Sequence, residues 1–388
     1  MNSTVYVDNN ATTAVAPEVT EAMLPYFTEH WGNPSSMHTF GGHVKRALDA
    51  AREKVAALIG AEHPSEIIFT SCGSESNNMA ILGAVDAMGG HPHVITTRVE
   101  HAAVLGPCHY LEDKGFRVST LDVDEKGRLD IERIREESMA GKKTVASIMW
   151  ANNETGVIFP VPEVGAVIKE GGGIYHTDAV QVAGKLPVNV KEIPVDLLSI
   201  SGHKLHAPKG IGALYVRRGT KLTPQIMGGH QERGRRAGTE NTPYIVGLGK
   251  ACELAMQTMD KDAAHERRLR DRLEAGILAT CKGARVNGDT EHRLPNTTNI
   301  SFEYVEGEAI LLMLDDVGIC ASTGSACASG SLEPSHVLRA MDVPRALLHG
   351  SIRFSLSRYN TDADIDDVLE KLPVIIDRLR ELSPFVKD

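Results

Sequence analysis

Residues 196–210 read DLLSISGHKLHAPKG, an apolar run followed at once by small and basic residues. The first six residues predict a short buried strand, and Lys204 lies just beyond its carboxyl end. In open α/β sheets, ligands bind outside the carboxyl ends of the strands. Burial there lowers the pKa of a lysine amine and makes it a nucleophile. The alternative is an ordinary surface lysine on a loop, and this stretch alone does not decide between the two.

Strand and helix patterns alternate around this stretch, through the first two-thirds of the chain. Buried strands are predicted over residues 66–70, 93–97, 144–150, 173–177, 196–201 and 210–216, and helices over 74–88, 102–114 and 161–170. Such alternation predicts a mostly parallel sheet with helices on both faces. The last three strands follow one another with few helical residues between them. Part of the sheet is therefore expected to depart from simple βαβ order.

The last third of the chain has a different pattern. One long helix is predicted over residues 248–280, followed by strands over 298–302 and 352–356 and helices over 308–317 and 363–382. A long helix of this kind often connects two structural units. Together with the length of 388 residues, this pattern predicts a large domain and a smaller α+β domain.

Composition excludes several classes of protein. The formal net charge of −10 disfavours a general nucleic-acid binder, because phosphate would be repelled. No apolar run approaches the roughly 18 residues that a membrane-spanning helix needs, and the first residues lack a signal-peptide pattern. The 6 cysteines include no CxxC pair, which indicates a reducing compartment. A cytoplasmic protein is expected, without a membrane or nucleic-acid partner.

Two further stretches carry groups that a phosphorylated cofactor needs. GIYHTDAVQ (173–181) ends a strand with Asp178, which is interpreted either as a helix cap or as a carboxylate that holds a proton on a ring nitrogen. TSCGSESNN (70–78) places Gly73 and Ser74 at a predicted helix start, where free N–H groups bind phosphate. An N-cap is the alternative for Ser74, and Cys72 is interpreted as a packing residue. Combined with Lys204, these groups are the parts needed to hold pyridoxal phosphate.

A lone thiol adds to this set. Residues 321–336 read ASTGSACASGSLEPSH, in which Cys327 is surrounded by small side chains. We expect a mobile loop with a reactive thiol, because small residues do not anchor a segment in one position.

At this point the sequence resembles a known family, the pyridoxal-phosphate-dependent cysteine desulfurases, and is most similar to the nitrogenase-associated NifS branch. The motifs that carry the resemblance are YVDNNATT, TSCGSES, VEHAAV, MWANNETG, YHTDAVQ, SGHKLHAPKG, GGHQERGRRAGTEN, GSACASGSLEPSHVLRAM and SIRFSLSRYNT. They run from residue 6 to residue 361. The resemblance implies a fold-type I pyridoxal-phosphate transferase with a mostly parallel seven-stranded sheet. It also implies a large domain over residues 15–258 and a small domain over 1–14 and 259–388, which carries the Cys327 loop.

The resemblance also implies the residue roles. Lys204 would carry the cofactor covalently and remove the substrate α-proton. Asp178 would pair with the ring nitrogen of the cofactor, and Gln181 would bond its phenolic oxygen. His101 would stack on the ring and take part in catalysis by moving protons. The phosphate would be bound by Gly73, Ser74, Ser201 and His203, and by Thr239 from the neighbouring subunit of a homodimer. Asn153 and Arg353 would hold the substrate, the arginine through its planar fork. For His101 a helix cap, and for Arg353 an ordinary ion pair, remain as alternatives.

The implied reaction converts L-cysteine to L-alanine and leaves a persulfide on Cys327. The sulfur acceptor would be an iron–sulfur scaffold protein, expected to serve nitrogenase maturation. No protein metal cage is expected, and a transient iron–sulfur contact would fall at Cys327. The alternatives are a selenocysteine lyase, another fold-type I pyridoxal-phosphate enzyme and a non-catalytic cluster carrier.

Overall fold

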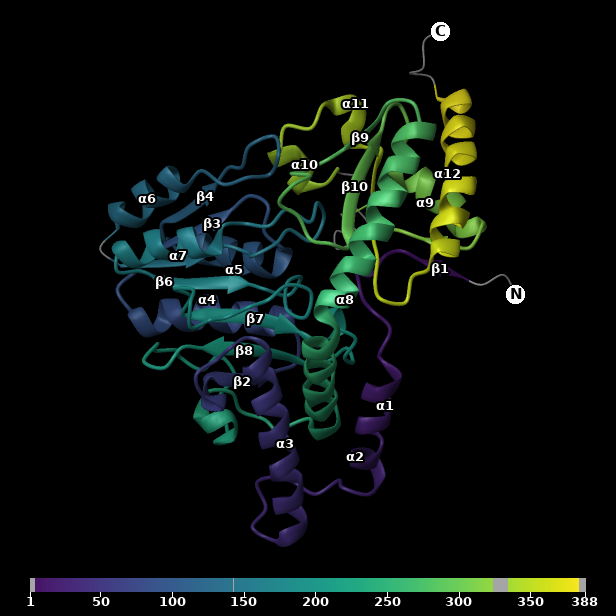
Figure 1. The fold of residues 1–388 in the computed structure, drawn as a ribbon. Coiled ribbons are helices and arrows are strands. Elements are labelled where there is room, and N and C mark those ends of the chain that lie inside the picture. Colours follow the sequence, from purple (N-terminus) through teal and green to yellow (C-terminus); the bar gives the residue numbers. More distant parts are fainter. Residues whose placement is uncertain (1–3, 142, 324–333, 384–388) are drawn as a thin grey trace.

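The computed structural model describes residues 4–141, 143–323 and 334–383. Its largest element is a seven-stranded sheet with strand order β2-β8-β7-β6-β5-β3-β4 (Figure 1). The strands are β2 (Ile67–Thr70), β3 (His93–Thr97), β4 (Val118–Leu121), β5 (Thr144–Ser147), β6 (Ile174–Asp178), β7 (Leu197–Ser201) and β8 (Gly212–Val216). The mostly parallel seven-stranded sheet expected from the sequence is confirmed.

The sheet departs from parallel order at one place, as the closely spaced strands predicted. β8 runs antiparallel to both of its neighbours, β7 and β2, whereas β7, β6, β5, β3 and β4 are parallel. Every residue of β7 and of β8 is buried. Strands in such a sheet are covered on both faces, which explains why β7 and β8 consist of apolar and small residues.

Helices cover both faces of the large sheet. Side chains of α4 (Gly73–Met88) and α5 (Ala102–Asp113) share one apolar cluster with the sheet. Side chains of α3 (Thr39–Leu58), α6 (Ile131–Ala140) and α7 (Val161–Glu170) belong to a second cluster. The two clusters contain alternate residues of the same strands, for example Ile67 and Ile68 of β2, because successive side chains of a strand point to opposite faces.

A second body of structure lies beside the large sheet, at the right of Figure 1. Its three-stranded sheet has the order β12-β10-β9. The elements are β9 (Ala284–Val286), β10 (Thr297–Phe302), β12 (Ser351–Ser355), α9 (Gly307–Asp316), α12 (Asp362–Leu382) and the pair β1 (Val5–Tyr6) and β11 (Ile319–Cys320). These elements share a third apolar cluster. The long helix α8 (Thr242–Thr280) contributes Ala251 to the large core and Leu273 to this one.

The remaining elements are short. They are α1 (Pro17–Met23), α2 (Pro25–Thr28), α10 (His336–Ala340), α11 (Arg345–Leu348) and the 3-10 turns η1 (Pro64–Glu66), η2 (Gly202–Lys204) and η3 (Gln231–Gly234). Val337 and Leu338 of α10 pack into the large core, although their position in the chain places them within the expected small domain. The domain limits of residues 15–258, and 1–14 with 259–388, stay a prediction.

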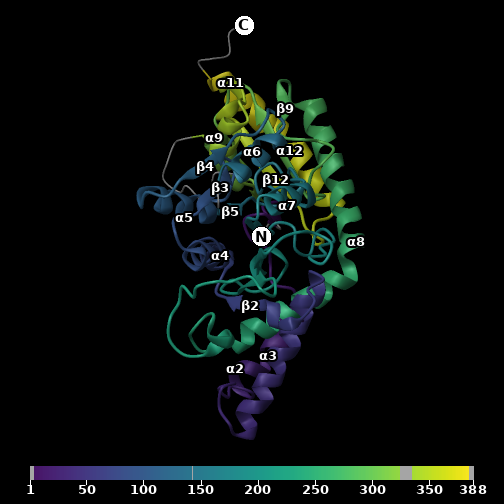
Figure 2. The same ribbon diagram turned by 90° about the vertical axis from the view of Figure 1, so that its left-hand side faces the viewer.

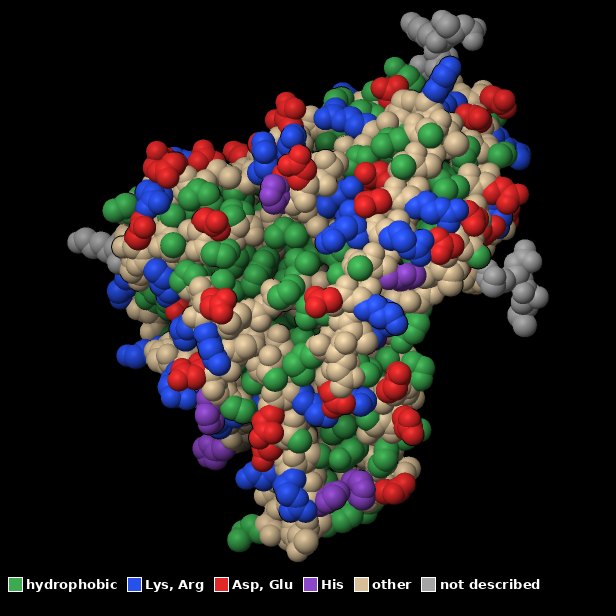
Figure 3. Space-filling view, in the orientation of Figure 1, with side chains coloured by type: hydrophobic (Ala, Val, Ile, Leu, Met, Phe, Trp, Pro, Cys, Tyr) green, Lys and Arg blue, Asp and Glu red, His purple; other side chains and the backbone are tan. Residues whose placement is uncertain are grey.

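Several predicted boundaries and elements differ from the structure. The strand expected over residues 144–150 ends at Ser147, and α3, β4 and α6 were not predicted. Figure 2 shows α3 at the lower end of the molecule, and α3 packs against α8. Figure 3 shows basic and acidic side chains interspersed over the visible face. Among the described residues, no helix is long and apolar enough to cross a membrane.

The topology brings distant parts of the sequence to one edge of the large sheet. β2, β6 and β7 end at Thr70, Asp178 and Ser201. These three strands point in the same direction, because β6 is parallel to β7 and because β8 is antiparallel to both β7 and β2. The segments that follow these strands, with the N-terminal residues Asn10 and Ala11, surround one cavity.

Candidate active site

A cavity of about 320 Å³ lies outside the carboxyl ends of the strands. It is lined by most of the residues singled out from the sequence, namely Gly73, Ser74, His101, Asn153, Asp178, Gln181, Ser201, His203, Lys204 and Arg353. Thr239 does not line it and is exposed. Cys327 lies outside the described residues. Positions far apart in the sequence, from Gly73 to Arg353, are therefore brought to one place.

Lys204 ends the 3-10 turn that follows β7. Its Nζ donates hydrogen bonds to the backbone carbonyls of Asn10, at 2.5 Å, and Ala11, at 2.6 Å. The side chain is half-buried. The N-terminal segment thus holds the lysine amine at the cavity wall through two carbonyl acceptors.

Asp178 is the last residue of β6 and is buried. Its Oδ2 accepts a hydrogen bond from Asn77 Nδ2 at 2.6 Å, and its Oδ1 accepts one from the Val180 N–H at 2.9 Å. The chain continues in turns and not in a helix, so Asp178 caps a turn through the Val180 N–H and does not cap a helix. A buried carboxylate held by two donors is suited to face a cationic ring nitrogen.

The N-terminus of α4 forms another wall. A Cβ placed on Gly73 would lie 3.0 Å from Val180 Cγ2 and 3.2 Å from Ser201 Cβ, so a side chain would crowd this wall. Ser74 is the second helical residue and does not cap the helix. The cap is Cys72, whose Sγ accepts from the Glu75 N–H at 3.4 Å, so Cys72 does more than pack.

Two histidines, His101 and His203, line the cavity. His101 caps α5, with Nδ1 accepting from the Ala103 N–H at 3.0 Å, so the capping alternative is real and leaves the ring in the cavity wall. His203 Nδ1 lies 3.2 Å from Thr12 Oγ1. Burial, reinforced by the charge of Lys204, lowers the pKa of His203 to about 4, so its ring is neutral near pH 7.

Arg353, on β12, brings a positive charge to the cavity and is buried. Its Nη1 donates to the Asn153 carbonyl at 3.1 Å, and its Nη2 pairs with Asp8 at 2.7 Å. The alternative of an ordinary ion pair is therefore also observed. Its Nε is buried and has no partner among the described atoms. A guanidinium has five N–H donors, so this one keeps donors for a carboxylate ligand.

Three contributors to the site were not predicted from the sequence. Asn77 bonds Asp178, Asp8 pairs with Arg353, and the carbonyl of Asn10 accepts from Lys204. Asn77 Oδ1 is a buried acceptor without a partner in the described structure. TSCGSESNN and YVDNNATT contain these residues, but local pattern gives no sign of the contacts they make.

The residues present fit pyridoxal phosphate. The cavity contains a lysine amine, a buried carboxylate and a helix N-terminus where no side chain projects from Gly73. Its volume of about 320 Å³ lies within the range of small-ligand pockets. When the group is bound, Lys204 would hold its aldehyde carbon, Asp178 its ring nitrogen, and the α4 terminus its phosphate. Fold and site together define a fold-type I pyridoxal-phosphate-dependent enzyme.

Within that class, the chain belongs to the aminotransferase class-V family, whose family model matches residues 5–368. It is 59% identical to a cysteine desulfurase of Trichormus azollae, over 100% of this chain and 96% of that protein. It is 56% identical to the cysteine desulfurase NifS of Azotobacter vinelandii, over 98% of this chain and 94% of that protein. A solved NifS-like protein superposes with a TM-score of 0.90 at 39% identity, covering 97% of this chain and all of that one. The family resemblance expected from the motifs is confirmed.

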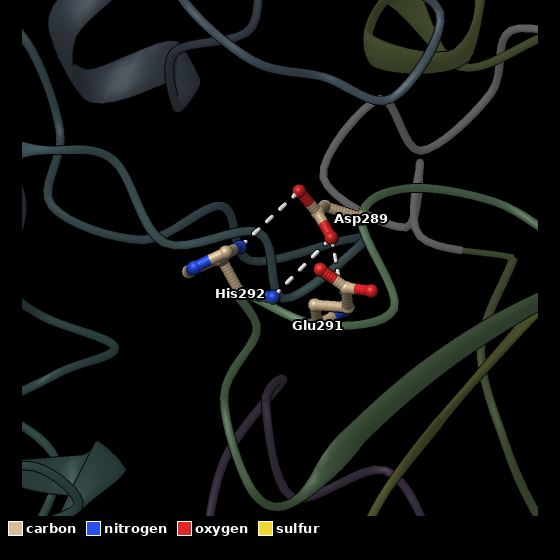
Figure 4. Close-up of side chains that lie close together, drawn as sticks. All are labelled: Asp289, Glu291 and His292. Atoms are coloured by element: carbon tan, nitrogen blue, oxygen red, sulfur yellow. Dashed lines mark hydrogen bonds and ion pairs between the residues drawn. The ribbon is translucent and has the colours of Figure 1, made fainter.

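The described residues contain one group with metal-ligand types close together, Asp289, Glu291 and His292 (Figure 4). Asp289 Oδ1 already accepts the Glu291 and His292 N–H groups, and its other oxygen lies 3.6 Å from His292 Nδ1. The group is therefore accounted for as a loop turn. His206 lies three residues after His203, and its Nδ1 bonds the Ala14 carbonyl at 2.9 Å.

Proposed function

We propose that the chain is a cysteine desulfurase, which converts L-cysteine to L-alanine and passes the sulfur to Cys327. The observation that carries the proposal is the single cavity in which Lys204, Asp178 and Arg353 meet. Full-length similarity to proteins named cysteine desulfurases supports the same substrate.

Substrate binding is assigned to Arg353 and Asn153. The guanidinium fork would hold the α-carboxylate through two parallel charged hydrogen bonds, a geometry that lysine lacks. Asp8 and the Asn153 carbonyl hold the guanidinium in place. The buried position of Arg353 excludes water from this contact and strengthens it.

Proton transfer is assigned to Lys204. When bound, pyridoxal phosphate supplies an electron sink that acidifies the substrate α-proton and weakens the Cβ–S bond. Lys204 would accept the α-proton at Nζ and later return a proton to the product. Asp178 would keep the ring nitrogen protonated, with its orientation fixed by Asn77 and the Val180 N–H. Neutral His203 adds a hydrogen-bonding group beside the lysine without a second charge.

Sulfur transfer is assigned to Cys327, which lies outside the described residues. Its thiolate attacks the substrate sulfur, so that one S–S bond forms while the Cβ–S bond breaks and its electron pair stays on the carbon fragment. Protonation of that fragment gives alanine, and the enzyme keeps a persulfide. An external thiol or a scaffold protein then takes the terminal sulfur.

We further propose a cytoplasmic homodimer that delivers sulfur to an iron–sulfur scaffold protein, in the service of nitrogenase. The exposed position of Thr239, away from the cavity of its own chain, supports its assignment to the neighbouring subunit's phosphate. Similarity to the cysteine desulfurase NifS of Azotobacter vinelandii supports the nitrogenase role.

A spectrum tests the proposal. The purified protein should show a visible absorbance band that borohydride removes, and digestion should then place the reduced cofactor on Lys204. Lys204→Ala should abolish both band and activity, whereas Lys209→Ala, five residues away and exposed, should retain them. A wild-type protein without the band, or a reduced cofactor attached elsewhere, would contradict the assignment.

A further inference from the structure

We propose that Lys185 is a positioning residue, which fixes the side-chain amide of Gln181 so that the amide presents an N–H to the ring oxygen of the cofactor. Lys185 lies outside the cavity lining and was not singled out from the sequence. The inference rests on the proposed cofactor site. It adds a residue that does not line the cavity and acts through its contact with Gln181.

The contacts between the two residues are direct. Lys185 Nζ lies 3.1 Å from Gln181 Oε1 and 3.2 Å from the Gln181 backbone carbonyl. On its other side, Gln181 Nε2 donates to the Asn10 carbonyl at 3.1 Å, the same carbonyl that accepts from Lys204. Gln181 is buried and lines the cavity. The amide is thus held from both ends.

These two contacts permit only one orientation of the amide. An ammonium group has donors and no acceptor, and a carbonyl is an acceptor only. If the amide flipped, its NH₂ group would face the ammonium of Lys185 and its oxygen would face the Asn10 carbonyl, and both contacts would become repulsive. The second hydrogen of Nε2 stays available in the cavity wall. Without Lys185, only the Asn10 contact would hold the orientation.

The surroundings of Lys185 indicate a dedicated role. Lys185 lines a second cavity of about 20 Å³, large enough for one water molecule, together with Lys204, Glu266, Asp262 and His206. Burial lowers the pKa of Lys185 to about 8, while the charge of Glu266 on α8 opposes that change. A lysine kept in such a place carries a desolvation cost, which its contacts with the two oxygens of Gln181 offset in part.

A donor to the ring oxygen has a spectroscopic consequence. When bound, the cofactor would titrate between two forms, and the deprotonated form would lack the neighbouring proton that offsets the negative charge of its ring oxygen. A fixed N–H stabilises that form and lowers the midpoint of the titration. The midpoint therefore reports the orientation of Gln181 independently of turnover.

The experiment is a double-mutant cycle on the holoenzyme, with the midpoint of the pH-dependent visible band as the readout. Lys185→Met should raise the midpoint by roughly one pH unit, and Gln181→Leu should raise it by a similar amount. The double variant should match Gln181→Leu alone, because Lys185 acts through Gln181. If Lys185→Met does not fold, Lys185→Gln goes through the same cycle.

Two results would overturn the inference. One is an unchanged midpoint in the Lys185 variant. The other is a further shift when the Lys185 change is added to Gln181→Leu, which would mean that the charge acts on the cofactor directly. Absence of a band in the wild-type protein would instead overturn the proposed function, and the inference would fall with it.

Discussion

Replacing Arg353 by lysine tests the proposed substrate site most sharply, because it keeps the charge and removes the fork. Asn153 and Asp8 take two of the five guanidinium donors, at 3.1 and 2.7 Å, and Nε is buried without a described partner. A lysine amine has three donors at one atom and cannot form the parallel pair with a carboxylate.

The magnitude follows from the lost contact. A hydrogen bond to a charged group contributes about 1.5–3 kcal/mol. Losing one of a parallel pair should therefore lower kcat/KM for L-cysteine by about 10- to 150-fold. Most of the change should fall on KM, because the carboxylate is held in both the ground state and the transition state.

The assay is alanine formation from L-cysteine at several substrate concentrations, with a dithiol present to remove sulfur. Arg358→Lys is the matched control, since Arg358 pairs with Asp262 at 3.0 Å and lies outside the main cavity. An unchanged kcat/KM in Arg353→Lys, or an equal loss in Arg358→Lys, would refute the assignment.

Two more predictions concern the support of the site. Asn77→Ala removes the 2.6 Å hydrogen bond to Asp178 and should reduce cofactor affinity by about tenfold or more, measured by equilibrium dialysis. The control is Asn78→Ala, because the Asn78 amide bonds the Ser74 carbonyl instead. Equal losses of affinity in the two variants would contradict the assignment. Burial lowers the pKa of His206 from 6.5 to about 4, so the unfolded chain binds more protons between these pH values and stability should fall on acidification through that window. His206→Gln should flatten the pH dependence of Tm between pH 6.5 and about 4. An unaltered slope would contradict the assignment of this pH dependence to His206.

The chemistry of the site could be predicted where residue type and strand ends coincide. Asp178 ends one short buried strand and Lys204 follows another, and parallel strands place such residues at one edge of a sheet. The sequence-based prediction of the fold succeeded for a related reason, since a buried strand such as β8 is a short run of apolar and small residues.

The second layer of the site could not be predicted. Asn77 reaches Asp178 across 101 residues of sequence, and only the packing of α4 against the sheet creates that contact. Lys185 looks like an ordinary turn lysine until Gln181 and Glu266 are placed around it. Periodicity reports which side of an element is buried and says nothing about its partners, so contacts of this kind need three-dimensional structure.

Elements with weak apolar signals were also missed. β4 is an edge strand with three half-exposed residues among its four, and α6 is rich in charged side chains. Neither has the long buried run that identified β7, so neither departs clearly from a loop pattern.

The central claim is that this chain moves sulfur from L-cysteine to its own Cys327. The direct measurement mixes the holoenzyme with an amount of L-cysteine equal to that of the enzyme and with no other thiol. It quantifies the amino-acid product together with the mass of the peptide that contains Cys327. The account predicts L-alanine in amounts equal to the enzyme, and a gain of one sulfur atom on that peptide. Cys327→Ser should give neither L-alanine nor the gain of sulfur. Pyruvate as the product, or an unmodified Cys327 peptide beside continued alanine formation, would contradict the account.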